Sequence, residues 1–127
     1  MGMSSLPERV SQAWKNREGP AILTTVDANR VPNSIYVTCV GMQGDDRMVV
    51  ADNYFNKTRQ NVKLGGIAAL LFIDKTGKAY QIKGTMEYHT EGAVFDGMKC
   101  WNPKKHPGHA ALAIRVEQIF SGSEKLL

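Results

Sequence analysis

Residues 47–64 read RMVVADNYFNKTRQNVKL, an apolar run that leads through a short polar turn into a stretch of helix-forming residues. The apolar run predicts a buried strand, and Asn56 belongs to the residue types that cap helices. The glycine pair at positions 65–66 is typical of a helix end. These signals together predict a strand followed directly by a helix that begins with Lys57 and Thr58.

The start of this predicted helix has the properties of an anion site. The free N–H groups of a first helical turn point outward, and the helix dipole favours negative charge there. Lys57 adds a charged donor and Thr58 a short hydroxyl, and Asn61 follows one turn later. A solvated helix face would carry the same residue types, and the spacing alone leaves both interpretations open.

The rest of the chain predicts a mainly β, α+β protein with about six strands and three short helices. Helices are expected near residues 5–18, 57–64 and 90–101, the first with a capping box of Ser5 and Glu8. Short turns between consecutive strands favour antiparallel pairing and a closed barrel, and residues 121–127 are expected to form a tail. The expected strands are 21–26, 31–42, 47–51, 67–73, 78–89 and 110–120.

Composition limits the possible classes of protein. The 127 residues are the size of one domain, which we expect to span residues 1–127. The net charge of +4 is mild and spread along the chain, so nucleic acid is not an expected partner. No apolar run is long enough to cross a membrane, and the N-terminus lacks an apolar signal core. Cys39 and Cys100 match no metal or redox spacing, so a cytoplasmic protein with reduced thiols is expected.

Catalytic side chains do not stand out in the sequence. His106 and His109 are separated by Pro107 and Gly108, which forbid a regular helix, and no carboxylate or thiol is placed to complete a metal site. We therefore expect no metal and no acid–base or nucleophilic machinery among the side chains alone. If the protein is an enzyme, a bound cofactor is expected to carry its chemistry.

The order of these elements is also informative. Lys57, Thr58 and Asn61 follow the third predicted strand, and Gly84 lies within the motif KGT of a long strand. With this arrangement, residues 6–120 resemble the pyridoxamine 5′-phosphate oxidase-like FMN-binding split-barrel family. The similarity is greatest to its short single-domain members, small bacterial FMN-binding proteins. The expected fold is accordingly a six-stranded antiparallel split β-barrel with short flanking helices.

The resemblance implies that FMN binds at the interface of a homodimer. The phosphate would lie at Lys57 and Thr58, close to Asn61. The partner subunit would add residues from its C-terminal half, for which Trp101 and the loop 106–109 are candidates. The ribityl chain and the ring would lie along the second strand and the end of the third, against Asn33, Ser34, Ile35, Val50, Ala51, Asp52 and Asn53.

Two departures argue against pyridoxamine phosphate oxidation itself. Family members with that activity carry an Arg on the first FMN-binding strand and an Arg-Pro-type signature near the C-terminus. Here residues 33–40 read NSIYVTCV and residues 121–127 read SGSEKLL. The expected function is therefore an FMN-dependent oxidoreductase that passes hydride or electrons to a small-molecule or protein partner. The alternatives are an FMN-binding electron carrier or flavin store, a barrel that binds another ligand such as an oligonucleotide, and a relative in which deazaflavin or haem replaces FMN.

Overall fold

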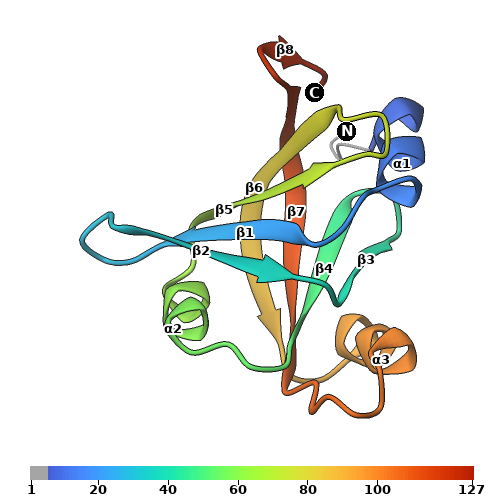
Figure 1. Ribbon diagram of the computed structural model, residues 1–127. Coiled ribbons are helices and arrows are strands. Elements are labelled where there is room, and N and C mark those ends of the chain that lie inside the picture. Colours follow the sequence, from blue (N-terminus) through green and yellow to red (C-terminus); the bar gives the residue numbers. More distant parts are fainter. Residues whose placement is uncertain (1–5) are drawn as a thin grey trace.

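A strongly curved antiparallel sheet dominates the computed structural model, which describes residues 6–127 (Figure 1). This part of the chain contains three helices, α1 (Glu8–Lys15), α2 (Lys57–Leu64) and α3 (Ala93–Trp101). The antiparallel sheet expected from the sequence is confirmed. Its eight strands are β1 (Ala21–Val26), β2 (Pro32–Val37), β3 (Val40–Gln43), β4 (Arg47–Asp52), β5 (Ile67–Ile73), β6 (Ala79–His89), β7 (Ala110–Ser121) and β8 (Glu124–Lys125).

The sheet is split between its two edge strands. The strand order is β2-β1-β5-β6-β7-β4-β3, and β8 pairs with β7 outside this path. Only Thr38 and Cys39 separate β2 from β3 along the chain, although β2 pairs with β1 and β3 pairs with β4. The prediction of one strand over residues 31–42 is therefore wrong. The strand breaks because the chain leaves one edge of the sheet and joins the other.

Other sequence predictions differ from the structure at element boundaries. Residues 121–127 are not a simple tail, because β8 pairs with β7. Together with the break at Thr38, this raises the strand count above the expected six. Asn56 does occupy the N-cap position of α2, but its side chain makes no capping hydrogen bond. The cap of α1 is Pro7, and the predicted contribution of Ser5 lies outside the described residues.

The main core fills the inner face of the curved sheet. Side chains from alternate positions of four strands meet there with no solvent exposure, because successive residues of a strand point to opposite faces. They are Leu23, Leu70, Ile82 and Ile114. Helix α1 covers this core with an apolar face that includes Val10 and Trp14, as its helical spacing predicted.

A second, smaller core lies on the outer face, under α3. Val49 and Ala51 of β4 and Ala111 of β7 pack there against Met98 of the helix. Small side chains on the strands let the helix approach closely. Because α3 is fixed on β4 and β7, the loop that follows it returns to the end of β4 (Figure 1).

Gly84 allows β6 to bend as it crosses β7. The pairing register of the two strands shifts between Lys83 and Gly84, which marks a β-bulge. A Cβ atom at position 84 would collide with the backbone carbonyl of Arg115, which cannot rotate away. The glycine of the KGT motif therefore has a structural role in the sheet.

We predict that Gly84→Ala lowers the free energy of unfolding by at least about 3 kcal/mol, because the methyl group forces two paired strands apart. Gly97→Ala is the matched control. The added Cβ would lie 3.3 Å from the flexible end of Gln43, and alanine favours a helix by about 1 kcal/mol. Urea unfolding followed by tryptophan fluorescence measures both. Equal stability of the two variants would contradict the prediction.

Candidate functional site

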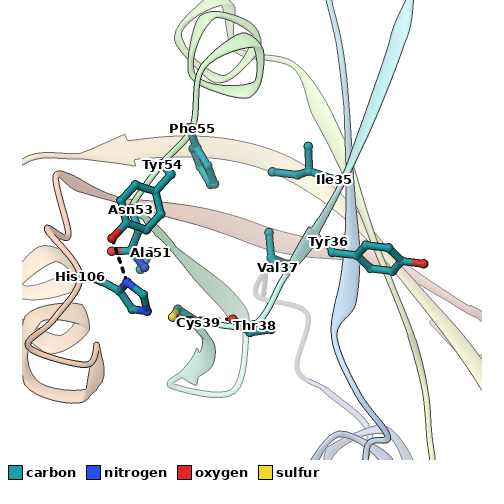
Figure 2. Close-up of a pocket in the computed structure, with 10 residues that line it drawn as sticks. All are labelled: Ile35, Tyr36, Val37, Thr38, Cys39, Ala51, Asn53, Tyr54, Phe55 and His106. Carbon is teal, nitrogen blue, oxygen red and sulfur yellow. Dashed lines mark hydrogen bonds between the residues drawn. The ribbon is translucent and has the colours of Figure 1, made fainter.

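A groove of about 270 Å³ opens where the barrel is split, between β2 and the end of β4. Figure 2 shows that its lining comes from three separate segments of the chain. None of the described residues that line it is acidic. The lining residues are Ile35, Tyr36, Val37, Thr38, Cys39, Ala51, Asn53, Tyr54, Phe55 and His106.

The end of β4 is fixed by the completely buried carboxylate of Asp52. Arg59 of α2 donates to it through Nε at 2.7 Å and Nη2 at 2.9 Å. The hydroxyl of Tyr88 on β6 donates at 2.6 Å, and the backbone N–H of Phe55 donates at 3.1 Å. One carboxylate thus joins β4, α2 and β6. Sequence reasoning placed Asp52 beside a ligand and missed this role.

The charge state of this cluster follows from its contacts. Burial acts to raise the pKa of Asp52, but the hydrogen bonds from Arg59 and Tyr88 outweigh it, so the pKa lies below its ordinary value. Burial and the hydrogen bond to the Asp52 carboxylate raise the pKa of Tyr88 to about 12. At neutral pH the cluster therefore consists of an anionic carboxylate, a cationic guanidinium and a neutral phenol.

The start of α2 forms a polar corner beside the groove. Thr58 is buried, and its Oγ1 accepts a hydrogen bond of 3.1 Å from the side-chain amide of Asn33 on β2. Lys57 is half-exposed, and its Nζ lies 3.6 Å from a carboxylate oxygen of Asp27. The structure thus brings together Asn33, Lys57 and Thr58, which the sequence assigned to one ligand.

Asn61 completes this corner with a buried atom that lacks a partner. Its Nδ2 donates to Thr25 Oγ1 at 3.0 Å, and its Oδ1 meets no hydrogen-bond donor in the described protein. Unpaired buried polar atoms are rare and costly, so such an atom is a mark of a ligand site. A hydroxyl-bearing chain such as ribityl would donate to it, and therefore the corner fits a sugar phosphate in chemistry.

The remaining predicted residues are distributed over several surfaces. Ile35, Ala51 and Asn53 line the groove. Val50 lies in the inner core, whereas Ser34 is exposed and hydrogen-bonded to Thr24. Trp101 lies against Gly41 of β3, where a Cβ atom would come within 3.2 Å of the indole, and it does not line the groove.

A buried pair of side-chain amides at the rim of the groove has no local signal in the sequence. The side chains of Asn53 and Asn102 exchange two hydrogen bonds, of 3.1 and 2.9 Å, across 49 positions of sequence. Such a distant partnership cannot be found from spacing. It ties the loop 102–109, which carries His106, to the end of β4.

Within residues 6–127, no three His, Cys, Asp or Glu side chains come together in a way that could hold a metal ion. None of the helices in this range is long and apolar enough to cross a membrane.

We predict that Asp52→Asn lowers the free energy of unfolding at pH 7 by about 3 kcal/mol. This is the lower end of the usual loss for a broken buried ion pair, because Arg59 is partly exposed to solvent. The pKa of Asp52 is lowered in the folded state. Its contribution to stability is therefore complete above the unfolded-state pKa of about 4 and is lost as the pH falls through the folded-state pKa. The difference between parent and variant should therefore shrink at pH 3 in urea unfolding. Asp45→Asn, at an exposed position, is the control and should change stability by under about 0.5 kcal/mol.

Comparison with known proteins agrees with this fold. An uncharacterised protein of Methanocaldococcus jannaschii is 27% identical over 105 residues, which cover 78% of this chain and 70% of that protein. HupZ of Group A Streptococcus has a crystal structure that matches with a TM-score of 0.80 and 27% identity, over 91% of this chain and 93% of HupZ.

A third similar protein shows the same fold. The crystal structure of an FMN-binding protein from Syntrophomonas wolfei matches with a TM-score of 0.71 over 88% of this chain and 82% of that chain. At 24% identity this similarity concerns the fold alone.

The model of the pyridoxamine 5′-phosphate oxidase family matches residues 7–121, nearly the whole described chain. The protein therefore belongs to the pyridoxamine 5′-phosphate oxidase family.

Proposed function

We propose that this protein is a flavoprotein that binds FMN and acts as an oxidoreductase. The observation that carries the proposal is the polar corner of Asn33, Lys57 and Thr58 beside the groove. A phosphate needs charged and hydroxyl donors, and a flat ring needs a largely apolar slot next to them. The FMN-binding protein of Syntrophomonas wolfei, which shares the fold, supports the choice of ligand.

Each part of the site has a distinct task in this proposal. Lys57, Thr58 and the first N–H groups of α2 hold the phosphate. Asn61 Oδ1 accepts from the ribityl chain, and Ile35 and Phe55 give the ring an apolar surface that excludes water. Bound FMN supplies hydride or single-electron transfer. The chain itself orients the ring, because the groove is fixed on two strands.

The proposal does not extend to the oxidation of pyridoxamine phosphate. Residues 33–40 lack the Arg that the oxidases carry on this strand, and residues 121–127 lack their C-terminal signature. The described residues that line the groove also include no lysine or arginine. The reaction is therefore defined by its cofactor and not by a named substrate.

We further propose that a second copy of the chain covers the outer face of β2, β1 and β5. Tyr36 pairs with Ile22, and Ile22 pairs with Leu71, so these three side chains form an apolar row across the strands. Tyr36 is 75% exposed and Ile67 50% exposed. The row is continuous with the groove, since Tyr36 lines both the groove and a smaller hollow on this face. A homodimer would therefore bury the row and close the site.

FMN binding is tested by fluorescence quenching during titration of the purified protein. We predict that Lys57→Ala and Thr58→Ala each weaken FMN binding by about 1–3 kcal/mol, or roughly 5- to 150-fold, because each removes a phosphate donor. Lys75→Ala, in an exposed turn, is the control and should bind like the parent. Circular dichroism confirms that the variants are folded.

Parent protein that fails to bind added FMN, or unchanged affinity in both variants, would overturn the assignment. The FMN-loaded protein also separates an enzyme from an electron carrier or flavin store. Anaerobic mixing with NADH or NADPH should bleach the flavin absorbance if the protein is a reductase. Absence of bleaching with both donors favours the carrier.

The homodimer is tested by sedimentation velocity. We predict that the parent sediments as a dimer, and that Leu71→Lys sediments as a monomer with at least tenfold weaker FMN binding, because a buried charge would oppose the interface. Gln118→Lys introduces the same charge at an exposed position of β7 and should remain dimeric. A parent monomer with full FMN affinity would contradict a shared site.

A further inference from the structure

The loop between α3 and β7 is clamped rigidly to the end of β4. Asn53 and Asn102, both buried, exchange two side-chain hydrogen bonds, and Asn53 Oδ1 also accepts from the backbone N–H of Gly108 at 2.9 Å. Lys99 Nζ donates to the carbonyl of Pro107 at 2.9 Å. The loop is thus fixed at both of its ends.

These hydrogen bonds of Asn53 and Asn102 also position a second pair of side chains at the groove. Tyr54 follows Asn53 directly, and His106 lies between Asn102 and Gly108. The Tyr54 hydroxyl and His106 Nδ1 are 3.1 Å apart, and the two rings meet edge to face with centroids 5.5 Å apart. Figure 2 shows both rings at one end of the groove, joined by this hydrogen bond.

The hydrogen bond between Tyr54 and His106 determines which ring nitrogen of His106 carries the proton and can bind a ligand. Tyr54 is 71% exposed, so its orientation depends on this contact and not on burial. When the hydroxyl donates to Nδ1, the proton of the neutral imidazole resides on Nε2. Within the described residues Nε2 has no partner, so in this tautomer it is a free N–H donor. The side-chain amide of Asn53, which also lines the groove, is already hydrogen-bonded to Asn102 and to the backbone N–H of Gly108.

We propose that His106 donates a hydrogen bond, through Nε2, to the carbonyl and nitrogen edge of an aromatic heterocycle bound in the groove. Tyr54 sets the tautomer of His106, and Asn102 is a positioning residue that acts through the loop. The inference rests on the proposed function, in which the heterocycle is the flavin ring. It adds a recognition element for the ring that is independent of the phosphate corner at Lys57.

Riboflavin, which has the ring but no phosphate, separates the two parts of the site. His106→Ala is expected to weaken the binding of riboflavin and FMN by the same factor, about tenfold, the equivalent of one hydrogen bond. Lys57→Ala should weaken FMN and leave riboflavin unchanged. His106→Gln, whose amide N–H reaches a similar point, should restore part of the lost affinity for both flavins. Lys105→Gln, on the same loop but outside the groove lining, should leave riboflavin binding unchanged.

The roles of Tyr54 and Asn102 are tested by double-mutant cycles with the same titrations. If both act through His106, Tyr54→Phe and Asn102→Ala weaken riboflavin binding in the parent and add nothing to His106→Ala. The visible absorption bands of bound riboflavin should shift equally in His106→Ala and in the double variants. Additive losses would overturn the positioning roles.

Two further results would overturn the inference on His106. Unchanged riboflavin binding in His106→Ala shows that the ring does not meet the imidazole. A loss confined to FMN shows that the loop acts on the phosphate. If the parent protein binds neither flavin, both this inference and the proposed function are overturned. If the parent binds both flavins and His106→Ala binds them equally well, only the inference on His106 fails.

Discussion

The buried carboxylate of Asp52 determines the arrangement of the whole site. Its hydrogen bonds to Arg59 and Tyr88 fix the direction in which the chain leaves β4 and enters α2. Its backbone carbonyl accepts from the N–H of His109, so the loop after α3 is anchored to the same residue. Groove residues Asn53 to Phe55 and the helix start at Lys57 both follow Asp52 directly in the chain, so its contacts position both. We expect this ion pair to specify geometry more than it adds net stability, because burying the carboxylate costs much of what the pairing gains.

Much of this geometry could be predicted from local patterns. A strand, a capping residue and a helix are adjacent in sequence. The start of α2 at Lys57 and Thr58 could therefore be predicted correctly. The alternation that buries Tyr80 and Ile82 on β6 is likewise a local property of a strand. The resemblance to the family rests on the order of these same elements, and the match of the family model over residues 7–121 confirms it.

Features that depend on distant partners could not be predicted. The break at Thr38 arises because β2 pairs with β1 and β3 pairs with β4, at opposite edges of the sheet. An apolar run of sequence does not show which strand it will pair with. The amide pair of Asn53 and Asn102 joins two loops that only the folded sheet brings together. The ligand contacts expected for Val50 and Trp101 stay predictions, and the structure places neither residue in the lining of the groove.

The split of the barrel has a mechanical consequence. Within the described residues, β2 and β4 share no ladder of backbone hydrogen bonds, and the link at Thr38 and Cys39 contains two residues. Moving β2 away from β4 therefore stretches side-chain contacts but breaks no strand pairing. A planar ligand in the groove would thus lie between two strands that backbone pairing leaves unconnected within residues 6–127, and its own contacts would join them.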